Sequence, residues 1–113
     1  MREKHWENSG GNILDKYIIK MFPQAYRDID RIYSQALLMS NYPDDAIALA
    51  EKLEQAILSL REQPYRGAER KYGFYAFKGY RQIIVENYII VYEVLENEKT
   101  VAVVTVKYGR SEF

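Results

Sequence analysis

Lysine, arginine and tyrosine side chains near predicted strand ends are the residues of this sequence that could carry chemistry. The candidates are Lys78, Arg81, Lys107, Tyr108 and Arg110. Such a set could cleave RNA without a metal ion: a Lys or Tyr moves protons while the 2′-hydroxyl of the RNA attacks the adjacent phosphate, and an Arg neutralises the growing charge. These groups would act together only if the fold brings them to one end of a sheet. Taken singly, each is equally well explained as a solvated or packed strand-end residue.

Other catalytic signatures are missing from the sequence. It has no paired His and carboxylate motif, no Gly-rich phosphate loop, no metal-ligand spacing and no Ser nucleophile elbow. It also has no cysteine, which excludes a disulfide framework, a thiol nucleophile and a thiolate metal site. We therefore expect no metal and no cofactor.

Charge is balanced overall but uneven along the chain. Sixteen basic and sixteen acidic residues give a formal net charge of zero. Residues 64–83 nevertheless contain five basic side chains and one acidic, whereas residues 24–62 contain four basic and seven acidic. Because binding to polyanions depends on clustered charge more than on the total, a local basic face remains compatible with this composition.

The elements that must position these residues follow from the apolar pattern. Residues 80–113 contain three runs rich in Ile, Val, Tyr and Thr, separated by polar turns at 86–87 and 96–99, which predicts an antiparallel meander. Upstream, residues 17–22 form a short apolar run. Pro23 then favours the start of a helix that reaches about Ser40.

The spacing of apolar residues makes this first helix amphipathic, with Arg27, Asp28, Asp30 and Arg31 largely on the polar face. A second helix is expected from Asp44 and Asp45, whose negative charge suits a helix N-terminus, to about Glu62. Residues 63–73 are expected to form a loop, residues 74–77 a short strand, and Lys78 and Gly79 a turn.

The predicted order is therefore β-α-α-β-β-β-β. It indicates an α+β fold in which a mostly antiparallel sheet carries an antiparallel two-helix hairpin on one face, with the opposite face free to bind. We expect one domain over residues 17–113, preceded by a polar extension, residues 1–16. No apolar run approaches membrane-spanning length and the first residues lack the apolar segment of a secretory signal, so a soluble cytoplasmic protein with no membrane partner is expected.

The order and spacing of four segments resemble the RelE/ParE superfamily, the toxin halves of type II toxin–antitoxin (plasmid stabilisation) systems. The segments are FPQAYRDIDRIY, AEKLEQAILSLREQPYRG, GYR followed after five residues by NYIIVYEV, and VKYGRSEF. The resemblance runs from about Tyr17 to Phe113. It implies a RelE/ParE-like fold, a growth-inhibiting activity and a cognate antitoxin protein as partner.

The resemblance to this superfamily implies two alternative targets for the toxin. The RelE-like branch comprises ribosome-dependent endoribonucleases that cut mRNA, and they typically carry an Arg where this sequence has Ile89. The position of Arg81 relative to the NYIIVYEV run, and the Tyr-Gly-Arg ending, look more like the ParE branch, whose members bind and inhibit DNA gyrase. The favoured reading is ParE-like gyrase inhibition, with Arg81, Tyr108 and Arg110 as contact residues.

Two other interpretations also fit the sequence. The rival is a RelE-like, metal-independent endoribonuclease acting on mRNA in the ribosome through all five candidate residues. A third reading is a non-toxic relative kept as a binding module. In either toxin reading, an antitoxin segment that adds a strand to a free sheet edge, or lays an amphipathic helix along the two-helix face, would cover surface left open by so small a domain.

Overall fold

The fold consists of one sheet and one helical hairpin. A computed structural model describes residues 16–110, so most of the predicted N-terminal extension and the last three residues lie outside the described part. The elements are, in chain order, β1 (Ile18–Met21), α1 (Pro23–Met39), α2 (Pro43–Ser59), β2 (Ala68–Glu69), β3 (Tyr80–Val85), β4 (Tyr88–Leu95) and β5 (Thr100–Tyr108), with a 3-10 turn at Glu96–Glu98. This confirms the predicted α+β order.

The sheet has five strands in the order β1-β5-β4-β3-β2. Strands β3 to β5 pair in antiparallel fashion, as the meander predicted. β2, which lies within the predicted loop, adds an antiparallel pairing with β3, and β1 pairs in parallel with β5, with Ile18 opposite Thr100. A β-bulge between Val91 and Tyr92 shifts the register of β4 against β5. The last strand of the chain is therefore the second strand of the sheet, held between β1 and β4.

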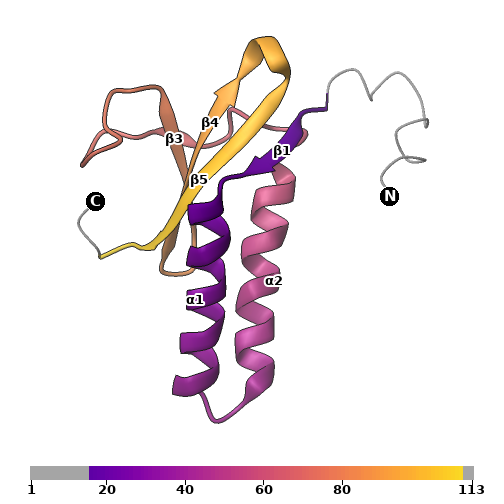
Figure 1. Cartoon of the computed structure of the whole chain (residues 1–113), viewed down its shortest axis with the longest axis vertical. Coiled ribbons are helices and arrows are strands. Elements are labelled where there is room, and N and C mark those ends of the chain that lie inside the picture. The colour runs from indigo at the N-terminus through magenta and orange to yellow at the C-terminus, as the bar shows by residue number, and fades with distance from the viewer. Residues whose placement is uncertain (1–15, 111–113) are drawn as a thin grey trace.

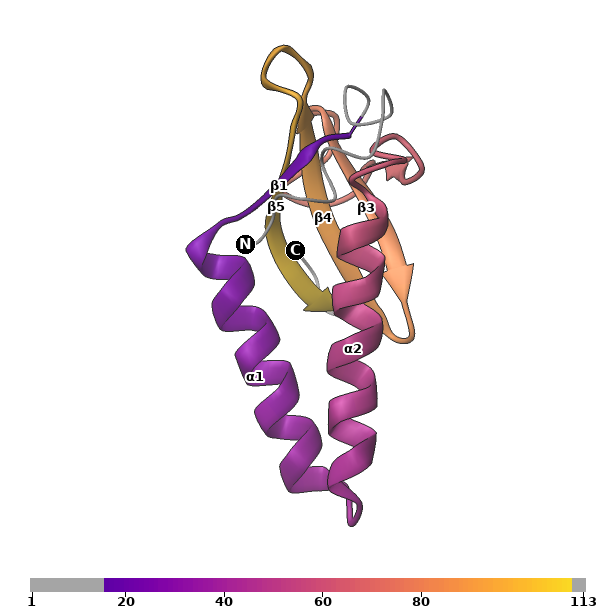
Figure 2. The same ribbon diagram turned by 90° about the vertical axis from the view of Figure 1, so that its right-hand side faces the viewer.

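Both helices lie on one face of this sheet and extend well beyond it (Figures 1 and 2). Each begins with a proline in its first turn, where a missing N–H costs little. Their apolar faces pack against the strands, with α1 over β5 and α2 beside β3. The core between the two layers consists of Ala25, Ile32, Leu53, Ile57, Leu60, Ile83, Ile90, Tyr92, Val101, Val103 and Val106.

The predicted short strand at residues 74–77 is wrong. This segment forms turns, and the two-residue strand β2 precedes it. Phe77 in this segment has a positive φ of 56°, and so have the flanking glycines, Gly73 at 74° and Gly79 at 88°. An extended strand requires negative φ, so these positions cannot belong to one.

The sheet face opposite the helices is only partly open. Because side chains alternate along a strand, Tyr80, Gln82 and Ile84 point away from the helices. The segment between β2 and β3 covers the first two: Arg70 donates a 2.6 Å hydrogen bond to the Gln82 side chain, and the Tyr75 ring packs edge-to-face on Tyr80 at 4.9 Å. Ile84 is 68% exposed. The face that we expected to be free is therefore open mainly toward its Ile84 end.

Neither helix of the described segment combines the length and the hydropathy that crossing a lipid bilayer would require.

Candidate functional site

The end of β5 is held in place by a buried carboxylate on α1. Asp28 is fully buried, and its Oδ2 accepts hydrogen bonds from the Thr105 hydroxyl and, at 3.0 Å, from the Val106 backbone N–H. Its Oδ1 accepts from Arg31 at 3.0 Å and lies 3.5 Å from the Lys107 ammonium. Gln24 donates a further hydrogen bond of 2.8 Å to Oδ1. Two cations and three neutral donors thus converge on one carboxyl group, and those from β5 fix the register of the strand end against the helix.

This corrects the expectation that Asp28 lies on the polar face of the first helix. Burial of the carboxyl by itself raises its pKa, but hydrogen bonds from Thr105, Val106, Gln24 and Arg31 outweigh that effect and hold the pKa below its ordinary value. Helical periodicity could not reveal this, because the buried donors among them, Thr105 and Val106, lie on a strand almost eighty residues away.

Beyond Lys107 the chain presents Tyr108, Gly109 and Arg110. The Tyr108 ring packs edge-to-face on Tyr88 at 5.7 Å yet stays 42% exposed. The Gly109 N–H donates a 2.6 Å hydrogen bond to the Asn87 carbonyl, and a Cβ at this glycine would lie only 3.1 Å from that oxygen. Arg110 is exposed. The result is a phenol and a guanidinium displayed on an anchored strand end.

Arg81 lies elsewhere and makes internal contacts. Its Nη1 donates to the Gly67 carbonyl at 3.0 Å, and its guanidinium lies 5.2 Å from the centre of the Tyr65 ring. Tyr65 in turn donates a 2.5 Å hydrogen bond to Glu96. The Arg81 side chain is therefore half-buried among groups that it holds in position.

Strand register separates Arg81 from the β5 end. Arg81 pairs with Tyr92, which pairs with Val103, whereas Tyr108 pairs with Tyr88. Val103 and Tyr108 are five positions apart, roughly 17 Å at about 3.3 Å per residue. The five candidate residues thus form two groups instead of one cluster.

Lys78 lies near the same end of β3 as Arg81 but contacts different residues. Its ammonium lies 4.0 Å from the centre of the Phe74 ring, and the preceding Phe77 N–H bonds to the Arg70 carbonyl beside the start of β3. At the other group, the strand neighbour of Lys107 is Ile89, so an aliphatic side chain occupies the position where the resemblance suggested a cation.

The titratable groups with shifted pKa values move away from neutrality. Hydrogen bonds from Lys99, Tyr65 and Tyr17 lower the pKa of Glu96 to about 2. Burial is the main cause that raises the pKa of Tyr80 and of Tyr92. None of these groups is thereby tuned as an acid or base for pH 7, where general catalysis is most efficient.

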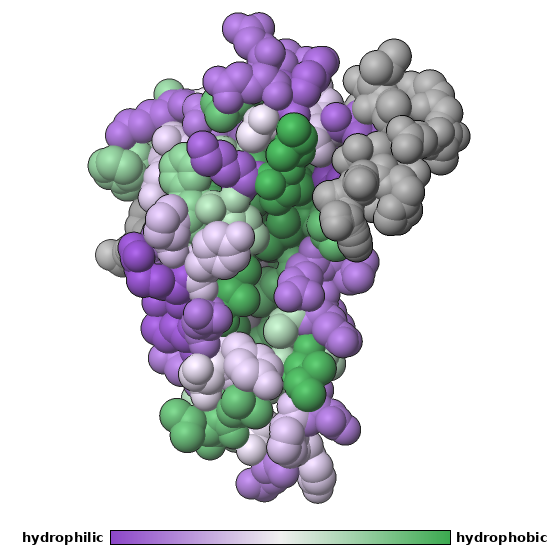
Figure 3. All heavy atoms as spheres, turned by 45° about the vertical axis from the view of Figure 1, so that its right-hand side comes forward, coloured by the Kyte–Doolittle hydropathy of each residue, from purple (hydrophilic) through white to green (hydrophobic). Residues whose placement is uncertain are grey.

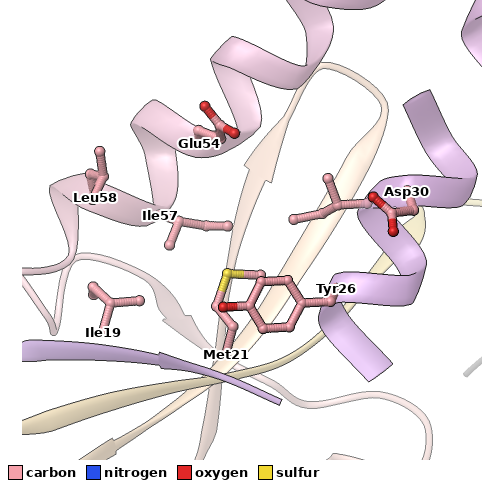
Figure 4. Close-up of a pocket in the computed structure, with 8 residues that line it drawn as sticks. Ile19, Met21, Tyr26, Asp30, Glu54, Ile57 and Leu58 are labelled. Carbon is pink, nitrogen blue, oxygen red and sulfur yellow. The ribbon is translucent and has the colours of Figure 1, made fainter. Parts of the chain in front are cut away.

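A second surface is a groove between β1 and the two helices, with a volume of about 410 Å³ (Figure 4). Its lining residues are Ile19, Met21, Tyr26, Ile29, Asp30, Glu54, Ile57 and Leu58. Met21, Tyr26 and Ile57 point into the space, and two carboxylates lie on the helices at its border. In the space-filling view, hydrophobic groups form a band down this side of the molecule between polar flanks (Figure 3).

Sequence reasoning anticipated this two-helix face but missed two of its residues. Tyr26 is 61% exposed and Leu58 is 48% exposed, and both lie outside the apolar stripes that pack against the sheet. The sequence did contain a signal for them. Each residue lies next to an apolar stripe, so each helix has an apolar face wider than packing against the sheet alone requires.

Comparison with known proteins gives a family match over most of the chain. Residues 19–113 match the model of the ParE toxin of the type II toxin–antitoxin system parDE. Among curated protein sequences, none matches.

Solved structures share the fold at low sequence identity. The chromosomal ParDE toxin–antitoxin system from P. aeruginosa aligns with a TM-score of 0.68 at 18% identity, covering 83% of this chain and 97% of that one. The RelBE2 toxin–antitoxin complex from Mycobacterium tuberculosis gives 0.57 at 19% identity, covering 82% and 91%. The YoeB/ParE toxin from Agrobacterium tumefaciens gives 0.54 at 18% identity, covering 80% and 96%.

Proposed function

Because the chain belongs to the ParE toxin family of type II toxin–antitoxin systems, we propose that it arrests growth by binding and inhibiting DNA gyrase. A cognate antitoxin keeps it inactive until the two separate. The observation that carries the proposal is the end of β5, where Tyr108 and Arg110 are displayed on a segment anchored through Asp28 and Asn87. An exposed phenol and an exposed guanidinium are typical contact groups of protein interfaces.

The arrangement supports binding more than RNA cleavage. Metal-independent cleavage needs a proton-transfer group and a cation around one phosphate. Arg81 bonds to the Gly67 carbonyl and lies against the Tyr65 ring, and the Lys107 ammonium lies beside Asp28. The two groups of candidate residues are also separated along the strands, because Arg81 is in register with Val103 and not with Tyr108. In the gyrase proposal, Tyr108 and Arg110 contact the target directly, and Arg81 contributes by holding the surface around Tyr65.

The test is inhibition of gyrase supercoiling by purified protein, compared with Arg110→Ala and Tyr108→Ala. We expect each substitution to weaken inhibition by about 2 kcal/mol, roughly thirtyfold in the half-inhibitory concentration, as for interface residues that carry much of the binding energy. The matched control is Lys20→Ala, an exposed cation on edge strand β1. Supercoiling that stays unchanged at large excess of the wild-type protein would refute the proposal.

The ribonuclease alternative is tested in the same strains. Mapping of mRNA 5′ ends shortly after induction should show no new in-frame ends if gyrase is the target. New ends that disappear in an Arg81→Ala, Arg110→Ala double variant would establish cleavage instead, and would show that Ile89 is compatible with it.

The groove supports the antitoxin part of the proposal. An apolar floor bordered by Asp30 and Glu54 favours an amphipathic helix whose apolar residues are flanked by Lys or Arg. The groove lies between α1, α2 and β1, away from Tyr108 and Arg110. Antitoxin binding and target binding would therefore use different residues.

Separating the two surfaces by mutation tests this arrangement. Leu58→Glu places a charge in the groove beside Glu54, so we expect the variant to inhibit gyrase but to escape neutralisation when the antitoxin is co-expressed. The control is Leu38→Glu, because Leu38 is 86% exposed on the far part of α1 and lines no part of the groove. Equal neutralisation of Leu58→Glu and the wild type would place the antitoxin elsewhere.

A further inference from the structure

The segment joining β2 to β3, residues 70–79, has an unusual composition for a surface loop. Its ten residues, RKYGFYAFKG, contain three cations, four aromatic residues and no acidic residue. We call it the aromatic loop. It projects from the β3 side of the sheet, away from the helical hairpin (Figure 1).

One side of the aromatic loop anchors it to the sheet. Arg70 bonds to the Gln82 side chain and to the Tyr72 carbonyl, and Tyr75 packs on Tyr80. These contacts account for the burial of Arg70, which is 6% exposed. The loop therefore has a fixed base and does not depend on its outer side chains for its attachment.

The other side displays large aromatic rings to solvent. Tyr72 is 76% exposed, Phe74 is 69% exposed and Phe77 is 72% exposed. Phe74 supports the Lys78 ammonium over one face of its ring and contacts Tyr75 with its edge. Three rings within six positions that leave most of their apolar surface in water contribute little to the hydrophobic stabilisation of the fold.

Phe77 adds a backbone cost to this exposure. Its φ of 56° lies in the left-handed region, which is unfavourable for a residue with a bulky side chain. Glycine would adopt this conformation without strain, as Gly73 and Gly79 do in the same loop. A strained, solvent-exposed phenylalanine is more readily explained by a ligand than by stability.

We propose that the aromatic loop binds single-stranded nucleic acid, with bases stacked on Tyr72 and Phe77 and phosphates neutralised by Lys71 and Lys78. Cations lie next to both rings in the sequence, and every base offers a face for stacking. The charge of residues 64–83 is complementary to a polyanion although the whole chain is neutral. Lysine is depleted at protein interface cores, so the composition favours a nucleic acid over a protein partner.

This surface goes beyond the proposed inhibition of gyrase and does not rest on it. Tyr108 pairs with Tyr88 at the far end of β4, Arg110 follows the end of β5, and the aromatic loop uses neither. Stacking does not read the sugar, so the chemistry fits DNA and RNA alike, and the experiment distinguishes them.

The test is fluorescence anisotropy of the full chain with labelled twelve-nucleotide oligo(dT), oligo(U) and a duplex of equal length, at several salt concentrations. Phe77→Gly removes a ring and relieves the strained φ, so it should keep or raise the thermal midpoint while weakening single-strand binding about five- to 150-fold. Tyr72→Ala should weaken binding to a similar extent. The control is Tyr42→Ala, since Tyr42 is 69% exposed but lies beside Asp44 and Asp45.

Salt dependence tests the cations separately from the rings. The magnitude of the negative slope of log affinity against log salt concentration should be smaller by about 0.7 in Lys71→Gln than in the wild type, because one phosphate contact on a single strand is lost. Tighter binding of either oligo(dT) or oligo(U) supports the proposal and identifies the preferred sugar. The proposal is overturned if neither single strand binds at low salt, if Phe77→Gly and Tyr72→Ala bind like the wild type, or if the duplex binds as tightly as the single strands.

Discussion

Replacing the buried Asp28 carboxylate should destabilise the whole domain. Every neighbour that contacts this carboxyl group is a donor: Thr105, Val106, Gln24 and Arg31 bond to it, and the Lys107 ammonium lies close by. Truncation to alanine leaves the Thr105 hydroxyl and the Val106 N–H, both almost fully buried, without an acceptor.

Each orphaned buried donor costs about 1–3 kcal/mol, so Asp28→Ala should lower the free energy of unfolding by about 2–6 kcal/mol. That is a large share of the roughly 5–15 kcal/mol typical of a domain. Asp28→Asn keeps the shape but turns one acceptor into a donor that faces other donors. We expect a loss of about 3–5 kcal/mol, as when one partner of a buried ion pair is removed.

The assay is urea unfolding followed by circular dichroism, with Asp30→Asn as control because Asp30 lies two residues away and is exposed. The pH dependence gives a second readout. Since the folded-state pKa of Asp28 is below its unfolded value, its contribution is complete above about pH 4 and is lost as the pH falls through the folded-state pKa. The gap between wild type and Asp28→Asn should therefore narrow in acid. A variant within about 0.5 kcal/mol of wild type at pH 7 would refute this account of the carboxylate.

Three further predictions concern the contacts around Arg81 and the β4–β5 turn. Glu96, with its pKa of about 2, should contribute stability above about pH 4.5 and lose it as the pH falls toward 2, so Glu96→Gln should flatten the curve of thermal midpoint against pH in that window. Gly67→Ala should cost about 1–3 kcal/mol in denaturant unfolding, because the new Cβ would lie 2.5 Å from the Gln82 carbonyl oxygen and 2.6 Å from the Tyr92 hydroxyl. Tyr92→Phe should cost about 1–3 kcal/mol in the same measurement, since the Gly67 N–H loses its buried acceptor; an unchanged midpoint for either variant would contradict these contacts.

The elements were readable from the sequence because local chemistry defines them. Pro23 marked the start of the first helix and Asp44 and Asp45 that of the second, polar turns at 86–87 and 96–99 separated the last three strands, and the apolar periodicities set the two layers. Residues 74–77 were misread because aromatic content favours strands, whereas positive φ at Phe77 depends on how the loop is anchored to Arg70.

The sites were less readable because they depend on register. Arg81 and Tyr108 each lie near the end of a strand. Only the pairing of Arg81 with Tyr92, and of Tyr92 with Val103, shows that Arg81 and Tyr108 are far apart along the strands. Likewise, no local pattern marks Asp28 as buried, since its buried partners Thr105 and Val106 come from β5. Side chains that meet through long-range pairing leave no spacing signal in a single sequence.

The parallel pairing of β1 with β5 has a consequence for the timing of folding. Ile18 lies opposite Thr100, so β1 has no partner until the chain has been synthesised through β5. β5 is also flanked on its other side by β4, which leaves the sheet incomplete until the C-terminal strand has been made. Pairing over such a separation in sequence is slow compared with helix formation, and translation adds only about 5–20 residues per second. The sheet, and with it the anchored strand end that carries Tyr108 and Arg110, should therefore form only after β5 has been synthesised.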